Sequence, residues 1–72
     1  MMDDLIEGLP WNKKLEILRA VKGWTQVEAA KRCNTHQKLY WSWEKGKTHP
    51  SKKSQAAIAS AYDVEIQDIF QV

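Results

Sequence analysis

The apolar residues of this chain recur at helical spacing in short segments that are separated by polar or glycine-containing breaks. Leu15 and Leu18, with Val21 as a further candidate, fall on one face of a helix predicted from Lys13 to about Lys22. We expect Asn12 to cap its start, because Asn accepts hydrogen bonds from backbone N–H groups, and Gly23 to end it in the left-handed conformation. The folded part of the chain is therefore predicted to begin with an amphipathic helix.

A second helix is predicted to start near Gln26 and to end at Asn34, a residue type that tolerates the left-handed backbone conformation. Thr25 is its expected N-cap, and Glu28 completes a capping-box pattern three residues later. The face that packs against a neighbouring helix is expected to consist of small side chains, namely Ala29, Ala30 and Cys33.

A third helix is predicted to open at Thr35 or His36 and to close at Gly46. The turn before it is short, so the second and third helices must pack on each other. Tyr40 and Trp43 recur at helical spacing and are expected to point inward. The residues expected on the outward face are Gln37, Lys38, Trp41 and Ser42.

Two further helices follow a basic loop. Ser51 caps the fourth, Ile58 and Tyr62 form its inner face, and Asp63 ends it. A last short helix is predicted over about residues 66–70. No segment has the alternation of a strand, so the fold class predicted is all-α with five helices.

Length and composition agree with one small domain. We expect residues 12–72 to form it and residues 1–11 to be a partly ordered segment. The lone Cys33 excludes an intramolecular disulfide, which fits a reducing compartment. The N-terminus lacks a basic region, and the apolar runs are too short to span a membrane, so a cytoplasmic location is expected.

A series of short motifs follows along the chain with the spacing of a single small domain. They are Leu15-x-x-Leu18-Arg19, Trp24-Thr25-Gln26, Trp43-Glu44-x-Gly46, Pro50-Ser51, Ile58-Ala59-x-x-Tyr62-Asp63-Val64 and Ile66 with Ile69-Phe70. In these motifs the chain resembles the Cro and lambda-repressor (XRE-type) helix-turn-helix domain over roughly residues 15–70. The resemblance implies a lambda-repressor-like domain whose second and third helices form the helix-turn-helix, with the third entering the DNA major groove.

The resemblance also implies roles for particular residues. Base reading falls to Gln37, Lys38 and Ser42: Gln suits adenine, Lys suits guanine, and Ser can donate or accept. The phosphate or backbone contacts fall to Gln26, His36, Lys45, Lys47 and Lys52. The family's partly buried salt bridge between its first helix and the end of its recognition helix maps onto Arg19 and Glu44.

The chain departs from the family's pattern at four positions, one of which is Asp63, where the family usually has Gly. His36 stands where the family prefers Ser or Thr, so the cap is either weaker or shifted to Thr35. Its imidazole can also reach a phosphate, more strongly when protonated, which predicts tighter DNA binding as the pH falls toward about 6. Leu39 is expected to touch a thymine methyl group and Trp41 to cover the boundary with a neighbouring helix. Alternatively, Leu39 and Trp41 form an exposed apolar patch for a protein partner.

The charges are unevenly distributed along the chain. Residues 31–53 hold seven basic residues and one acid, a net charge of +6, whereas the rest holds four basic and eight acidic residues, a net charge of −4. A lysine-rich solvated loop alone would explain such a segment in an arbitrary domain. Here the positive segment coincides with the second half of the helix-turn-helix and the loop after it, so phosphate is the expected partner.

Catalytic chemistry has little support in the sequence. No nucleophile with an orienting acid and base and no Gly-rich phosphate loop can be assembled, so neither a catalytic residue nor a cofactor is expected. Cys33 and His36 have the spacing of half a metal site, but no second ligand pair accompanies them, and Cys33 is better explained as a small core residue. We therefore expect a binding protein and no metal.

We predict a sequence-specific DNA-binding transcriptional regulator, a phage, prophage or bacterial repressor that binds a palindromic operator as a homodimer. No membrane and no small-molecule ligand are expected as partners. The alternative is a protein-interaction module, an antitoxin or adaptor, that uses Leu39 and Trp41. The candidates for a dimer surface, which can equally close the core, are Ile66, Ile69, Phe70 and Val72.

Overall fold

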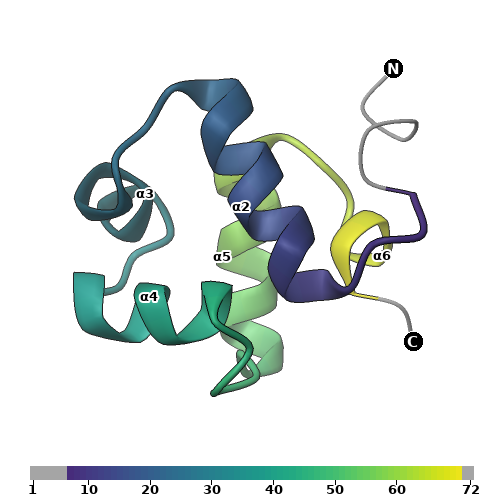
Figure 1. The fold of residues 1–72 in the computed structure, drawn as a ribbon. Helices are drawn as coiled ribbons and strands as arrows, with labels where there is room; N and C mark the ends of the chain where they lie inside the picture. The colour runs from purple at the N-terminus through teal and green to yellow at the C-terminus, as the bar shows by residue number, and fades with distance from the viewer. Residues whose placement is uncertain (1–6, 71–72) are drawn as a thin grey trace.

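The computed structural model describes residues 7–70, which form five α-helices and contain no strand. In Figure 1, α2 lies across α5, α3 and α4 pack beside them at one end, and α6 packs at the other. The all-α prediction is therefore confirmed. None of the helices in this part of the chain is long and apolar enough to cross a membrane. The helices are α2 (Trp11–Lys22), α3 (Gln26–Arg32), α4 (Gln37–Glu44), α5 (Lys52–Tyr62) and α6 (Ile66–Ile69).

The start of α2 differs from the prediction. Pro10, in an extended conformation, holds the N-cap position, and its carbonyl accepts from the N–H groups of Lys13 and Lys14. A proline before a helix loses nothing, because the N–H groups of the first turn have no helical partner in any case. Asn12 does not cap the helix: its Nδ2 donates to the carbonyl of Glu44 at 3.1 Å. The expected domain boundary at residue 12 thus falls inside α2.

The helix-turn-helix has the local structure that its sequence predicted. Thr25 Oγ1 accepts from the N–H of Glu28, and Glu28 Oε1 accepts from the N–H of Thr25, which completes the capping box. Asn34 adopts a φ of 64° and Thr35 N–H donates to the carbonyl of Ala30. These bonds close the tight turn between α3 and α4.

The cap of α4 settles the alternatives left open at its start. His36 is the N-cap, and its ring Nδ1 accepts from the N–H of Leu39 at 3.3 Å, so the cap does not shift to Thr35. Ser51 caps α5 through the N–H of Ser54, and Asp63 ends α5 with a φ of 56°. The last helix stops one residue earlier than predicted, with Phe70 extended after it.

The core lies where all five helices meet. Tyr40 and Tyr62 are buried there with their hydroxyl groups hydrogen-bonded to each other, and Trp24 stacks on the Tyr62 ring at 5.4 Å. Ile69 and Phe70 are buried as well, so they close the core and are not available for a dimer surface. Val21 is 50% exposed and does not join the inner face of α2. Ile66 also remains exposed, and Val72 lies outside the described residues. The other buried apolar residues are Leu15, Leu18, Ala29, Ala30, Cys33, Trp43, Ile58 and Ala59.

Candidate nucleic-acid interface

The outward face of α4 is open to solvent. Gln37 and Lys38 are exposed on its first turn, while Tyr40 and Trp43 point into the core from the opposite side. The buried side chains that α3 contributes to its contact with α4 are small, so the inward face of α4 can pack close to α3. The predicted base-reading residues at the start of α4 are therefore not covered by other described parts of the chain.

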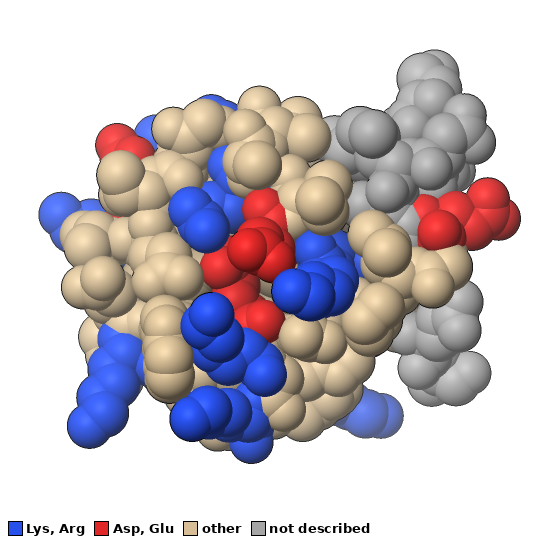
Figure 2. Space-filling model, viewed as in Figure 1, with Lys and Arg blue, Asp and Glu red and all other residues tan. Residues whose placement is uncertain are grey.

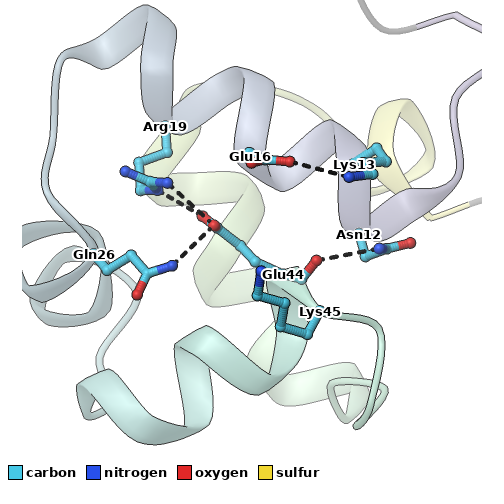
Figure 3. Close-up of a pocket in the computed structure, with 7 residues that line it drawn as sticks. All are labelled: Asn12, Lys13, Glu16, Arg19, Gln26, Glu44 and Lys45. Atoms are coloured by element: carbon cyan, nitrogen blue, oxygen red, sulfur yellow. Dashed lines mark hydrogen bonds and ion pairs between the residues drawn. The ribbon is translucent and has the colours of Figure 1, made fainter.

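Glu44, at the end of α4, joins three helices through its carboxylate. Arg19 of α2 donates from Nε to Oε2 at 2.7 Å and from Nη2 to Oε1 at 3.2 Å (Figure 3). Gln26 of α3 donates from Nε2 to the same Oε1 at 3.2 Å. The Glu44 side chain is only 4% exposed, and its hydrogen bond holds the pKa of Arg19 above its usual range. The expected ion pair is thus present, with Gln26 as an additional member.

A polar hollow of about 240 Å³ opens beside this bridge. Its charged groups are largely paired with one another: Lys13 Nζ lies 3.5 Å from Glu16 Oε1, and Arg19 binds Glu44 (Figure 3). The hollow is lined by Asn12, Lys13, Glu16, Arg19, Gln26, Glu44 and Lys45.

Gly46 lies two residues after the end of α4, and its backbone conformation favours glycine. It adopts a φ of 73°, and a Cβ at this position would lie 3.3 Å from the side chain of Asn12. An L-residue would therefore meet both backbone strain and a tight contact. Asn12 also donates to the Glu44 carbonyl, so the start of α2 is hydrogen-bonded to the end of α4 beside this turn.

Gln26 was expected to bind a phosphate, but its side chain is already hydrogen-bonded within the protein. Its amide nitrogen already donates to Glu44, so only one of its two N–H groups remains for a phosphate. The same side chain also lines a second, open hollow of about 280 Å³, together with Gln37, Lys38 and Trp41. Gln26 therefore lies at the junction between the buried bridge and the outward face of α4.

Ser42 is half-buried and donates its hydroxyl hydrogen to Thr48 Oγ1 at 2.9 Å. This bond ties the second turn of α4 to the loop that carries Lys47. The Ser42 oxygen keeps acceptor capacity toward a base, but its donor is already used. Thr48 was missed by sequence reasoning, because no local pattern indicates that a loop residue returns to bind the helix.

Trp41 and Leu39 lie in different surroundings. Trp41 is 38% exposed, with Lys45 Nζ 5.9 Å and Lys47 Nζ 5.1 Å from its ring centroid. Leu39 is half-buried and packs against the core. Since residues two apart on a helix do not share a face, these side chains do not form one joint apolar patch.

The lysines predicted to bind phosphate lie at the surface. Lys45, Lys47 and Lys52 are exposed, as is His36 at the start of α4. In Figure 2 basic side chains border an acidic patch at the centre of this face, above and beside it over α2 and below it over α4 and the segment after α4. The positive charge near α4 is therefore present but interrupted by carboxylates.

Cys33 has no exposed reactive surface. Burial raises the pKa of its thiol to about 12, which keeps it protonated at neutral pH. His36, which has the spacing of half a metal site from Cys33, uses Nδ1 for the α4 cap. Within residues 7–70 no three His, Cys, Asp or Glu side chains are grouped so as to hold a metal ion.

Comparison with known proteins agrees with this geometry. The sequence pattern of the helix-turn-helix family matches residues 15–69, which include α3, α4 and both members of the Arg19–Glu44 pair. An uncharacterized helix-turn-helix-type transcriptional regulator of Methanocaldococcus jannaschii is 39% identical over 57 residues, covering 79% of this chain and 86% of the relative. No solved structure matches the chain significantly. With its short α3–α4 turn and its exposed α4 face, the protein belongs to the Cro/C1-type helix-turn-helix family.

Proposed function

We propose that the protein is a sequence-specific transcriptional repressor that inserts α4 into the major groove of a palindromic operator. The observation that carries the proposal is the exposed pair Gln37 and Lys38 on the first turn of α4, a helix anchored at its other end by the Arg19–Glu44 bridge. A helix presented in this way can enter a groove without reorganising the core. Family membership supports the DNA-binding and transcription-regulating part of the proposal.

The proposed contacts follow from donor and acceptor chemistry. Gln37 can bind adenine through N6 and N7, and Lys38 can donate to guanine O6 and N7. Ser42 is proposed as an acceptor, because its hydrogen is directed to Thr48. The groups proposed to bind phosphates are Gln26, His36, Lys45, Lys47 and Lys52.

His36 is proposed to use Nε2 for this contact. Its Nδ1 accepts the capping hydrogen bond, so in the neutral ring the hydrogen sits on Nε2 and can be donated to a phosphate. Protonation would strengthen the attraction to phosphate but would place a hydrogen on the capping nitrogen. The two effects oppose each other, which makes the expected gain in affinity at low pH smaller than the sequence alone suggested.

Two matched substitutions test the proposal. Lys38→Ala should weaken binding to the selected operator and relax the base preference at one position, because a base contact is lost. Lys45→Ala should weaken binding to all duplexes alike and reduce the slope of log K against log salt by about one, because one phosphate contact is lost. Selection from a random duplex library, followed by titrations at several salt concentrations, measures both effects.

The interaction-module alternative makes the opposite prediction. Trp41→Ala would abolish capture of a protein partner, whereas the two lysine substitutions would change little. Enrichment of no duplex by the wild-type protein at physiological salt would contradict the repressor proposal and favour this alternative. A palindromic consensus would instead support both the function and the two-fold symmetry of the bound form.

A further inference from the structure

Trp41 is a large apolar side chain in the middle of the outward face of α4. It is 38% exposed and lies one helical turn after Gln37 and one turn before Lys45. With Gln26, Gln37 and Lys38 it lines the open hollow of about 280 Å³. An indole ring therefore stands among the residues that are proposed to meet DNA.

Leu39, the residue expected from the sequence to make apolar contact with DNA, is not in this position. It is half-buried against the core, two residues before Trp41 and on a different side of the helix. The structure reverses the two roles: Leu39 fills the boundary with the core, and Trp41 is the exposed apolar group.

The charges around Trp41 indicate what kind of partner can cover it. The ammonium groups of Lys45 and Lys47 lie 5.9 Å and 5.1 Å from its ring centroid. An apolar protein surface seated on the ring would have to remove water from both cations without compensating them, which is unfavourable. Duplex DNA presents the thymine methyl group, which can pack against the ring, and phosphates, which can neutralise both lysines. It can therefore contact the apolar ring and the two cations at the same time.

We propose that Trp41 selects a thymine in each operator half-site by packing its ring against the thymine 5-methyl group. That methyl group is the apolar feature that base edges present in the major groove. The inference rests on the proposed function, since it names what one further residue of the same face reads. Gln37 and Lys38 recognise hydrogen-bonding groups, whereas Trp41 recognises the presence of the methyl group.

Replacing thymine by uracil tests this directly, because uracil lacks only the methyl group. In the operator selected with the wild-type protein, each thymine is replaced singly and the dissociation constant is measured for each duplex. The wild-type protein should bind about fourfold more weakly when one particular thymine of a half-site is replaced singly, as expected for one lost methyl contact. Trp41→Ala should bind the thymine and uracil duplexes equally well.

Two comparison variants and a folding check make the result specific. Gln37→Ala should lose affinity but keep the methyl dependence, since it reads a different group. Val21→Ala, which removes an exposed apolar side chain from α2, should behave as the wild type does. Far-UV circular dichroism and a thermal melt check that Trp41→Ala remains folded, which its exposed position leads us to expect.

The outcomes separate this inference from the function on which it rests. An operator that shows no methyl dependence at any thymine overturns the inference alone, and so does equal methyl dependence in Trp41→Ala and the wild type. A uniform loss of affinity in Trp41→Ala, without methyl dependence in the wild type, also overturns it. If the wild type enriches no duplex at all, the DNA-reading function fails and the inference fails with it.

Discussion

Three core side chains, Cys33, Tyr40 and Tyr62, carry ionisable groups whose charged forms the interior disfavours. Burial raises the pKa of each side chain, and the two tyrosine hydroxyl groups are hydrogen-bonded to each other. In the unfolded chain these groups ionise at about pH 8.5 for Cys and about pH 10 for Tyr. At high pH the unfolded state therefore binds fewer protons than the native state, and stability falls as the pH rises.

The substitution Tyr62→Phe measures how much Tyr62 contributes to the loss of stability at high pH. Above about pH 10.5, the free energy of unfolding of the wild type should fall more steeply than that of the variant, with a difference in slope that rises toward about 1.4 kcal/mol per pH unit. At neutral pH the variant should be less stable by about 1–3 kcal/mol, because the Tyr40 hydroxyl loses a buried partner. Urea titrations from pH 7 to 11 give both values. Parallel pH slopes for the two proteins would contradict the burial argument.

At the scale of elements, the Arg19–Glu44 pair joins the end of α4 to α2. The carboxylate is almost fully buried and receives hydrogen bonds from side chains of two helices, which replace the water it would bind at the surface. The Lys22–Asp63 pair joins the ends of α2 and α5, but its Asp side chain is 81% exposed. The two pairs have similar chemistry and different surroundings, which makes them a matched comparison.

Arg19→Ala should destabilise the protein by roughly 3–5 kcal/mol, because it leaves a buried carboxylate without its cation. Lys22→Ala should cost no more than about 1 kcal/mol, since water solvates the remaining Asp63. The combined change Arg19→Met with Glu44→Leu should cost less than Arg19→Ala, because it removes both charges. Thermal and urea unfolding compare the three variants. Equal stability of Arg19→Ala and the wild type would show that the bridge does not hold the helices.

At the scale of the whole molecule, one exposed helix face can read only a few base pairs. A dimer on two half-sites about 34 Å apart would supply the remaining affinity and specificity. Of the expected dimer residues within the described part of the chain, only Ile66 stays at the surface, while Ile69 and Phe70 are buried in the core. Ile66 is therefore the remaining described candidate from that set for a contact between copies.

Half-site spacing tests the dimer proposal whichever surface forms the interface. Inserting about five base pairs between the half-sites places them on opposite sides of the duplex and should reduce affinity toward that of a single half-site. Ile66→Lys should have the same effect on the unaltered operator if Ile66 lies in the interface, while a single half-site should bind both proteins equally. Gel-shift stoichiometry and sedimentation follow the change. Affinity that does not depend on spacing would indicate independent monomers.

The sequence by itself determined the helices and most of their ends. Thr25 with Glu28, Asn34, Ser51 and Asp63 act through hydrogen bonds or backbone preferences that span at most a few residues, so their roles follow from local order. The inward positions of α4 follow in the same way from helical spacing. For the bridge between α2 and α4, the resemblance to a known family supplied the pairing, which spacing alone would not have done.

Tertiary structure decided where competing side chains go. Asn12 gives up a local cap for a carbonyl 32 residues away, Lys14 is buried with its Nζ 2.9 Å from the Asp68 carbonyl, and Ser42 binds a loop residue. Which of Leu39 and Trp41 remains exposed depends on how α4 rotates against the core. In each case the side chain binds a group that is distant in the sequence. That group comes within reach only when the helices have packed, so local sequence could not predict the contact.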